Sequence, residues 1–316
     1  MRLGIVMDPI AAINIKKDST FEMIWQAQQL GWVLEYIEMN DMLINNGIAK
    51  ARTRRLTVQQ DSDNWFSLSD PVFEDLGNLD AILMRKDPPF DMEFVYATYI
   101  LELAEKQGAL VVNSPQALRD CGEKTYCAWF PQLCPDTLIA REAQDFKTFL
   151  EKHSDIIVKP LDGMGGTSIF RVSKGSPNIN VIIETLTEYG QRYAMAQTFI
   201  PEISDGDKRI LMVNGEAVPY VLARMPAKGE TRGNLAAGGT GVAREISESD
   251  LHIANVVGPE LVKRNILFAG LDVIGDRLTE INVTSPTCIK EINAEYGTNI
   301  ALDLLKVIEN KLNSKV

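Results

Sequence analysis

The chain has 316 residues, of which 45% are apolar, and this is enough for two or three domains. Its 43 acidic and 32 basic residues give a net charge of −11, which argues against a protein that binds nucleic acid or a membrane surface, because such proteins need a basic face. The apolar runs are well below the roughly 18 residues that a membrane span requires, so no transmembrane segment is expected.

The first part of the sequence alternates strand and helix patterns, which predicts an α/β domain built on a parallel sheet. Ser19 is the expected N-cap of the first helix, and Gly31 is its expected end. Residues 46–60 interrupt the alternation with an additional stretch of strand character. The predicted strands cover residues 2–7, 32–39, 79–87 and 109–113, and the predicted helices cover residues 19–31 and 90–108.

Two short helices are predicted within residues 113–130, and the first domain boundary is placed near residue 121. Strands and helices then follow in an order typical of an α+β unit. The predicted strands cover residues 136–140, 156–161, 168–172 and 193–200, with one helix after the first strand and another near 178–189.

The last part of the sequence predicts two hairpins. The first covers residues 207–225, with Asn214-Gly215 as its turn, and the second covers residues 267–283. Between them lie a long segment of small residues at 226–241 and a helix at 247–265 that begins with a capping signature. One further helix is expected to close the chain.

The four cysteines lack the C-x-x-C spacing of a zinc site, and His153 and His252 are far apart. Neither a zinc site nor a disulfide framework is therefore expected. The first residues include Arg2, but Asp8 and Pro9 break the apolar run, so no signal peptide is expected. These features predict a reduced, cytoplasmic enzyme.

Two carboxylates are expected to face each other in the second hairpin. If its turn is Gly275-Asp276-Arg277, Asp272 lies opposite Glu280, and Asn282 shares the face of Glu280 because side chains alternate along a strand. A cation would remove the repulsion between the carboxylates, and hard oxygen ligands suit Mg²⁺. The alternative is a solvated hairpin with ordinary surface acids, but the apolar residues around these side chains favour a buried hairpin.

A lysine and a glycine-rich loop lie together in the stretch "IIVKPLDGMGGTSIF". Lys159 ends an apolar strand, and the loop that contains Gly163, Gly165 and Gly166 offers unobstructed backbone N–H groups, which suits a triphosphate. The stretch is neither a P-loop nor a dinucleotide fingerprint. Lys124 is a second candidate cation, expected on an early helix. The alternatives are a plain hairpin turn with a salt-bridged lysine, and a solvated surface lysine.

The remaining candidate residues are polar groups that would hold the rest of a nucleotide and a carboxylate substrate. The segment 195–200 would supply backbone groups for an adenine, and Asp207 could bind a ribose hydroxyl. Arginine suits a bidentate grip on a carboxylate, and surface ion pairing is the alternative for each arginine. Four arginines are candidates: Arg85 at the carboxyl end of a strand, Arg209 and Arg224 on the arms of the first hairpin, and Arg232 in the segment 226–241.

Taken together, five stretches resemble the bacterial glutathione synthetases, which are ATP-grasp ligases. The resemblance extends from the first strand to near residue 300 and is carried by "MRKDPPFD", "DIIVKPLDGMGGTSIFRV", "DGDKRILMVNGE", "ETRGNLAAGGTG" and "GLDVIGDRLTEINVTSPTCI". It implies an N-terminal α/β domain followed by an ATP-grasp fold of two α+β subdomains. The implied domains are residues 1–121, a central lid at 122–200 and a C-terminal domain at 201–316.

The resemblance also implies roles for individual residues. Lys159, Arg209 and Arg232 would be catalytic, and the metal ligands would be Asp272, Glu280 and Asn282. The nucleotide would contact Lys124, Lys159, Gly163, Gly165, Gly166, Gln197, Thr198, Ile200 and Asp207. The substrates would contact Arg85, Arg209, Arg224, Arg232, Asn282, Ser285 and Thr287. The family pattern ends its mobile loop with Gly-Gly-Arg-Gly, whereas this chain has Thr240 in place of the arginine.

The implied reaction joins γ-glutamylcysteine to glycine through an acyl phosphate, with ATP as co-substrate and Mg²⁺, or alternatively Mn²⁺, as the metal. The loops at 163–166 and 226–241 would close over the site, because an acyl phosphate must be kept from water. The resemblance also implies a homotetramer. The alternatives are another ATP-grasp carboxylate–amine ligase, a phosphotransferase to a hydroxyl, and a nucleotide-binding protein without turnover, against which the intact set of lysines and carboxylates argues.

Overall fold

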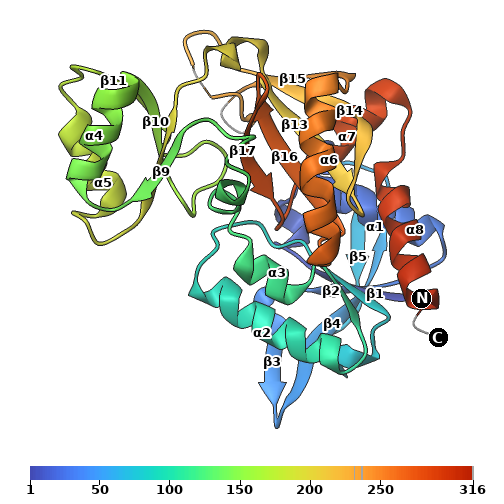
Figure 1. The fold of residues 1–316 in the computed structure, drawn as a ribbon. Helices are drawn as coiled ribbons and strands as arrows, with labels where there is room; N and C mark the ends of the chain where they lie inside the picture. The colour runs from blue at the N-terminus through green and yellow to red at the C-terminus, as the bar shows by residue number, and fades with distance from the viewer. Residues whose placement is uncertain (231, 236–237, 315–316) are drawn as a thin grey trace.

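The computed structural model describes residues 1–230, 232–235 and 238–314, which form three sheets with helices packed against them (Figure 1). Thr231, Ala236 and Ala237, which belong to the segment predicted as a lid, lie outside the described residues. In the part of the chain that is described, none of the helices combines the length and the apolar character that a membrane span requires.

The N-terminal sheet has a parallel centre, as predicted, but the sheet as a whole is mixed. Strands β2, β1, β7 and β8 are parallel neighbours, and the stretch predicted between the second and third strands forms the long β4, which pairs antiparallel with β2. The strands are β1 (Arg2–Val6), β2 (Val33–Ile37), β3 (Met42–Asn45), β4 (Ile48–Val58), β5 (Phe66–Leu68), β6 (Val72–Asp75), β7 (Ala81–Met84) and β8 (Leu110–Val112).

Two helices cover this sheet, α1 (Ser19–Gln29) and α2 (Met92–Lys106). The prediction that Ser19 caps α1 is wrong, because Asp18 accepts a hydrogen bond from the Phe21 N–H at 2.6 Å and so satisfies a free donor of the first turn. Gly31, with φ of +75°, follows the end of α1 as expected. Short 3₁₀ turns lie at η1 (Ile10–Ala12), η2 (Met39–Asp41) and η3 (Leu76–Asn78).

The central sheet is antiparallel, has the order β11-β10-β12-β9, and lies apart from the rest of the molecule in Figure 1. Its predicted strands and helices are all present. They are β9 (Thr137–Ala140), α4 (Ala143–His153), β10 (Asp155–Pro160), β11 (Phe170–Ser173), α5 (Ile179–Thr187) and β12 (Ala194–Thr198). A hydrophobic core of its own, with Phe146, Val158 and Ile183 among its members, holds the helices on the sheet.

The C-terminal sheet has the order β15-β14-β13-β16-β17, with all neighbours antiparallel. Asn214 and Gly215 form the predicted turn with φ of +49° and +83°. The end of the segment 226–241 was predicted as loop, but Thr240 and Gly241 begin an edge strand that pairs with β14. The strands are β13 (Asp207–Val213), β14 (Glu216–Met225), β15 (Thr240–Glu245), β16 (Phe268–Ile274) and β17 (Arg277–Asn282).

The helices of this part are α6 (Glu248–Lys263), α7 (Ile289–Tyr296) and α8 (Ile300–Asn313), after η5 (Pro201–Asp205). The expected capping signature of α6 is confirmed, because Ser247 and Asp250 form a reciprocal capping box. The predicted closing helix is present as α8, but α7 was not predicted, and the chain turns between the two at Gly297, with φ of +64°.

The segment between the first two sheets contains α3 (Pro115–Asp120) and η4 (Tyr126–Trp129) and runs along the edge of β17. The Leu278 N–H donates to the Leu133 carbonyl at 2.9 Å, and the Ile281 N–H donates to the Glu123 carbonyl at 3.0 Å. Lys124 was predicted on a helix but lies in the turn between α3 and η4. These backbone bonds place the turn beside the second hairpin.

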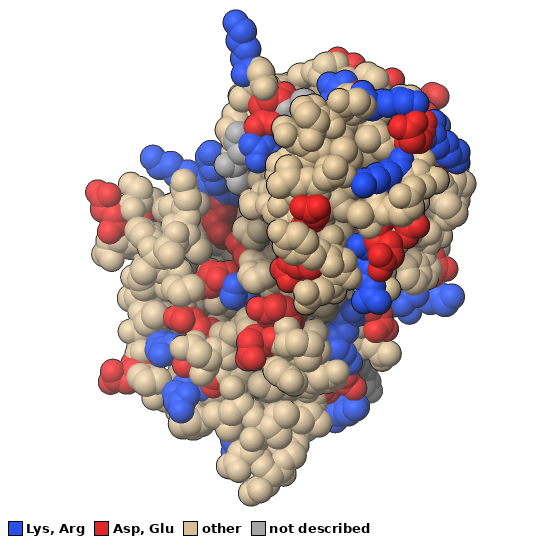
Figure 2. All heavy atoms as spheres, turned by 90° about the vertical axis from the view of Figure 1, so that its left-hand side faces the viewer, with Lys and Arg blue, Asp and Glu red and all other residues tan. Residues whose placement is uncertain are grey.

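The N-terminal and C-terminal sheets share their hydrophobic cores. One cluster of buried residues contains both Ile82 and Leu271, and another contains both Leu3 and Leu304. On the face shown in Figure 2, Lys and Arg side chains are interspersed with Asp and Glu, so this face carries both signs of charge.

Candidate active site

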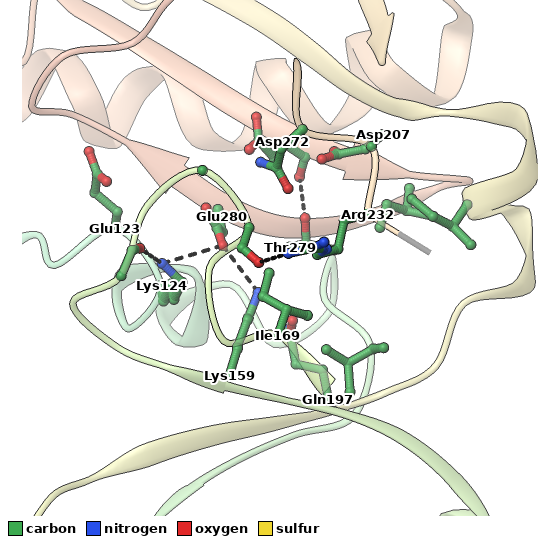
Figure 3. Close-up of a pocket in the computed structure, with 18 of the residues that line it drawn as sticks. Glu123, Lys124, Lys159, Ile169, Gln197, Asp207, Arg232, Asp272, Thr279 and Glu280 are labelled. Atoms are coloured by element: carbon green, nitrogen blue, oxygen red, sulfur yellow. Dashed lines mark hydrogen bonds and ion pairs between the residues drawn. The ribbon is translucent and has the colours of Figure 1, made fainter. Parts of the chain in front are cut away.

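A cleft lies between the central and C-terminal sheets and encloses about 1000 Å³, open space included. Its walls come from β10, β12, β13, β16, β17, the turn at Lys124 and the glycine loop, and Figure 3 shows their side chains pointing toward one another. The cleft therefore brings together residues that are more than 150 positions apart in the sequence. All nine of the predicted nucleotide contacts line it: Lys124, Lys159, Gly163, Gly165, Gly166, Gln197, Thr198, Ile200 and Asp207.

The predicted pairing of the two carboxylates is confirmed, since Asp272 lies opposite Glu280. The predicted three-residue turn is wrong. The turn has two residues, Gly275 and Asp276, and Thr279 forms a bulge that restores the register. The Thr279 hydroxyl donates to the Asp272 carbonyl at 3.1 Å and so fixes the bulge.

Asp272 is buried between two arginines. The Arg209 Nε donates to Asp272 Oδ1 at 2.5 Å, and the Arg224 Nη2 lies 2.9 Å from Asp272 Oδ2. Burial alone would raise the pKa of Asp272, but the two guanidinium groups outweigh it and hold the pKa well below its ordinary value. Surface ion pairing does not describe Arg209 and Arg224, because both are buried.

Asp207 lies at the start of β13 and pairs with the same Arg224 at 2.5 Å through Oδ2. Its other oxygen, Oδ1, is buried and has no hydrogen-bond partner among the described residues. Burial raises the pKa of Asp207 to about 6, although Arg224 lowers it. A buried, unpaired carboxylate oxygen in the wall of a cleft suits a hydroxyl donor of a ligand.

Asp207 makes the stability of the protein depend on pH. Its folded pKa of about 6 lies above the ordinary 3.8, so the folded state binds the proton more tightly and this contribution is lost as pH rises through about 6. We expect the unfolding free energy of the wild type, relative to Asp207→Asn, to fall by up to about 3 kcal/mol between pH 4 and 7. Urea denaturation of both proteins between pH 4 and 7 measures this difference in unfolding free energy, and a difference that does not change with pH would contradict the prediction.

Glu280 faces two lysines from the opposite side of the cleft (Figure 3). Its Oε1 lies 3.3 Å from the Lys159 Nζ and 3.7 Å from the Lys124 Nζ, and both lysines are buried. Burial would raise the pKa of Glu280, but Lys124 and Lys159 lower it further than burial raises it. Both carboxylates of the hairpin are thus held in their ionised form.

The glycine loop joins β10 to β11 and is held at both ends. The Lys124 Nζ donates to the Gly163 carbonyl at 2.5 Å, and the Arg232 guanidinium donates to the Gly166 carbonyl at 3.0 Å. Gly166 has φ of +80°, which favours glycine, and a Cβ there would lie 2.7 Å from the Asn234 side-chain oxygen, so a larger residue would also displace that side chain. Arg232 also pairs with Glu230 and connects the two loops predicted as lids.

The strand β12 continues into the segment predicted to hold an adenine. Gln197, Thr198 and Ile200 line the cleft together with Phe199. The Gln197 amide donates to the Thr137 hydroxyl at 3.2 Å, so its side chain is anchored on the neighbouring strand β9. The backbone of this segment is thereby fixed at the apolar end of the cleft.

Of the seven predicted substrate residues, three line the cleft and four do not. Asn282, Arg209 and Arg232 line the cleft. Three others lie together outside its wall, where Arg85 is buried and donates to the Pro286 carbonyl at 2.9 Å, and Ser285 donates to the Arg85 carbonyl at 3.4 Å. Thr287 follows on this segment, and Arg224 lies behind Asp207 and Asp272 rather than in the wall of the cleft.

The hairpin offers hard oxygen ligands for a divalent cation. Asp272 and Glu280 are ionised and opposed, and Asn282 follows Glu280 on the same face, with its amide nitrogen donating to the Gly270 carbonyl at 3.2 Å. The described residues hold no cluster of three His, Cys, Asp or Glu side chains arranged for a metal. Two carboxylates and one amide fit Mg²⁺, which takes its remaining ligands from water and substrate phosphates.

Glu123, which precedes Lys124, lines the cleft but was not predicted as a site residue. Its Oε1 accepts hydrogen bonds from the Val283 and Thr284 N–H groups, both at 3.1 Å, and from the Thr284 hydroxyl at 2.6 Å. A single acid in an irregular segment has no periodic signal, and its position beside a candidate lysine was the only available indication.

Comparisons with known proteins agree along the whole chain. Residues 1–119 match the family model of the prokaryotic glutathione synthetase N-terminal domain, and residues 123–297 match that of the prokaryotic glutathione synthetase ATP-grasp domain. A glutathione synthetase of Vibrio vulnificus (strain CMCP6) is 59% identical over 315 residues, which cover 100% of this chain and 99% of the relative.

Solved structures with little sequence identity share the fold. The D-cycloserine synthetase DcsG superposes with a TM-score of 0.68 at 12% identity, over 99% of this chain and 100% of that chain. The ATP-grasp ligase PsnB, in a complex with a minimal precursor, Mg and ADP, superposes with a TM-score of 0.62 at 12% identity, over 98% of each chain. At this identity the likeness concerns the fold alone.

Proposed function

The chain belongs to the prokaryotic glutathione synthetase family, and from this premise we infer how its own residues carry out the reaction. The reaction is the ATP-dependent ligation of γ-L-glutamyl-L-cysteine with glycine through an acyl phosphate, which yields glutathione, ADP and phosphate. The enzyme is a carbon–nitrogen ligase, and the family uses ATP with Mg²⁺. The observation that carries our assignment of roles is the pair of opposed carboxylates held between two lysines and two arginines.

The lysines would contact the phosphates of ATP. Lys124 and Lys159 both line the cleft beside Glu280, so their charges can offset the negative charge of the transferring group. Asp272, Glu280 and Asn282 would hold Mg²⁺ or, as a finer proposal, Mn²⁺, which when bound neutralises phosphate charge. Gln197, Thr198 and Ile200 would contact the adenine, and the unpaired Asp207 oxygen would accept a ribose hydroxyl.

The arginines would position the carboxylates of the substrates. Arg209 lines the cleft beside Asp272 and would contact the cysteinyl carboxylate as it attacks the γ-phosphate, with Arg224 behind it. Arg232 would contact the transferring phosphoryl group from the segment 226–241. Arg85, Ser285 and Thr287 lie together beyond the cleft wall and would contact the far end of the dipeptide.

The glycine loop and the segment 226–241 would close over the acyl phosphate and exclude water. The bond from Arg232 to the Gly166 carbonyl supports this proposal, because it joins the two segments into one cover. Thr240 begins β15 and stands at the position where the family pattern has an arginine. Among the described residues of the segment 226–241, Arg232 is the cation that lines the cleft.

Stiffening the glycine loop should reduce turnover more than ATP binding. Gly165 has φ of +66°, so Gly165→Val strains the loop, and we expect kcat to fall by roughly 10- to 100-fold with an ATP dissociation constant within a few-fold of wild type. Stopped-flow binding and steady-state kinetics measure the two quantities. Gly175→Val is the matched control, because its φ is +84° and its Cβ would meet open space away from the cleft. Poor ATP binding with normal turnover at saturation would refute the lid.

Four further proposals concern the molecule as a whole. We propose the domains 1–121, 122–200 and 201–316, a division that follows the three sheets. We also propose that the protein is a homo-oligomer, a tetramer by family resemblance, and that it is cytoplasmic. Its small-molecule partners would be ATP, γ-glutamylcysteine and glycine, and it would bind neither nucleic acid nor a membrane. The negative net charge, and the mixture of positive and negative side chains on the face shown in Figure 2, support the proposal that the protein binds neither nucleic acid nor a membrane.

Mass spectrometry of the protein with MgATP, γ-glutamylcysteine and glycine, with each substrate omitted in turn, tests the assignment. We expect glutathione, ADP and phosphate only in the complete mixture. ADP without glutathione would indicate another ATP-grasp ligase with a different acceptor. ADP without free phosphate would indicate a phosphotransferase, and no ADP under any condition would indicate a nucleotide-binding protein without turnover.

A further inference from the structure

A second cleft lies beside the nucleotide cleft and encloses about 1210 Å³, open space included. Its walls come from the N-terminal domain, the segment around Glu123 and the central sheet, with Phe90, Leu161 and Gln191 among them. The two clefts share Glu123 and Gly163, and the bond from Lys124 to the Gly163 carbonyl lies at this junction. Glu123 therefore stands where the two clefts meet.

The carboxylate of Glu123 is held by one of its two oxygens. Oε1 accepts the three bonds from Val283 and Thr284, and the backbone carbonyl of Glu123 accepts the Ile281 N–H. The described residues provide no hydrogen bond or ion pair to Oε2, and the side chain is only partly buried. The structure thus presents a carboxylate of fixed orientation with one oxygen available to a ligand.

Three charged groups face Glu123: Lys124 beside it, Glu280 on β17 and Arg85 at the end of β7. Burial raises the pKa of Glu123 above its ordinary value, Thr284 and Lys124 lower it, and Glu280 raises it, with a raised pKa as the result. Because Oε1 is held by three hydrogen bonds and Oε2 is available to a ligand, the carboxylate is placed to accept a proton from a ligand in the cleft.

The ligase reaction needs such an acceptor. The amine of free glycine is protonated at neutral pH, and an ammonium group has no electron pair with which to attack a carbonyl. Lys124 and Lys159 line the nucleotide cleft as cations, so they cannot take this proton while they contact phosphate. On the reaction assigned above, we propose that Glu123 is the general base for glycine, and that glycine reaches the acyl phosphate through the second cleft.

The proton and electron balance of this step is complete. The Glu123 carboxylate takes one proton from the glycine ammonium, and the freed electron pair forms the carbon–nitrogen bond at the acyl carbon. The carbon–oxygen bond to the phosphoryl group breaks, and the phosphate leaves with that electron pair. The second nitrogen proton passes to the leaving phosphate, which departs as hydrogen phosphate, and Glu123 releases its proton to solvent.

The test compares two acceptors in Glu123→Gln, whose amide oxygen can still accept the bonds from Val283 and Thr284. Hydroxylamine is largely unprotonated at neutral pH and needs no base. We expect the rate with glycine to fall by roughly 100-fold or more, and the rate with hydroxylamine, measured as the hydroxamate by mass spectrometry, to stay within about threefold of wild type. Equal losses with both acceptors would overturn the proposal and leave Glu123 as a positioning residue for Lys124.

The pH dependence gives a second readout. If Glu123 accepts the proton, kcat/KM of the wild type for glycine should be flat from pH 7 to 9, whereas that of Glu123→Gln should rise about tenfold per pH unit as free amine becomes available. A tenfold rise per unit in the wild type itself would overturn the proposal, and this measurement does not depend on the folding of the variant.

Glu142→Gln is the matched control, because this exposed acid precedes α4, lines neither cleft, and should leave both rates unchanged. A failure of the assigned reaction is distinguishable from a failure of this inference. In the first case the wild type forms no glutathione from the complete mixture, and in the second the wild type forms glutathione but the two acceptors respond alike to Glu123→Gln.

Discussion

Glu280→Gln should reduce kcat by about 1,000-fold while the protein remains folded. The substitution keeps the shape of the side chain but removes the negative charge that lies 3.3 Å from Lys159 and 3.7 Å from Lys124. It leaves two buried cations facing each other and takes an anionic ligand from the proposed metal site. Steady-state kinetics at saturating MgATP measures the loss.

The Mg²⁺ dependence separates the metal role of Glu280 from its role beside the lysines. A lost ligand should raise the Mg²⁺ concentration needed for half-maximal rate, in addition to lowering kcat. Asp276→Asn, in the exposed turn of the same hairpin, is the matched control and should behave like the wild type. A variant with an unchanged Mg²⁺ requirement would refute the assignment of Glu280 as a ligand, and a nearly unchanged kcat would refute its part in catalysis.

Asp272→Asn should destabilise the protein by about 3–5 kcal/mol and abolish activity. The carboxylate is buried against Arg209 and Arg224, and its loss leaves Arg209 without its partner and Arg224 with Asp207 alone. Because the folded pKa is lowered, this stabilisation is present above pH 4 and is lost as pH falls toward the folded pKa. Urea denaturation at pH 7 and at lower pH measures both the loss and its pH dependence.

A partly exposed aspartate with an exposed arginine partner provides the comparison for Asp272. Asp155 accepts from Arg171 at 2.6 Å near the surface, and Asp155→Asn should cost less than about 1 kcal/mol, since solvent screens an exposed pair. If Asp272→Asn cost no more than Asp155→Asn, burial of the arginine–aspartate cluster would not be what holds the hairpin in place.

The pairing of Asp272 with Glu280 could be predicted because it depends only on the twofold alternation of a hairpin. The turn that produces this pairing could not be predicted, since a three-residue turn and a two-residue turn followed by a bulge at Thr279 give the same register. The strands and helices of the central sheet were predictable for a related reason, because each has a clear apolar period and a polar boundary.

The contacts of Arg224 were beyond sequence reasoning. A regular hairpin with its turn at Asn214-Gly215 would place Asp207 opposite Leu222, but an irregularity between Ile210 and Met212 shifts the register and places Asp207 opposite Arg224. The contact of Arg224 with Asp272 depends on strand order, because β13 lies between β14 and β16. Lys124 was placed on a helix because its neighbours have helical propensity, but backbone bonds from β17 to Glu123 and Leu133 hold its segment as a turn. Tertiary contacts override local propensity in such segments.

The distribution of hydrophobic cores divides the molecule differently from its three sheets. The N-terminal and C-terminal sheets share two clusters of buried side chains, so they are expected to unfold together as one cooperative unit. The central sheet relies mainly on its own smaller core around Phe146 and Val158. It is therefore expected to have a lower local stability than this larger unit, and a nucleotide bound between the two would protect the central sheet from cellular proteases.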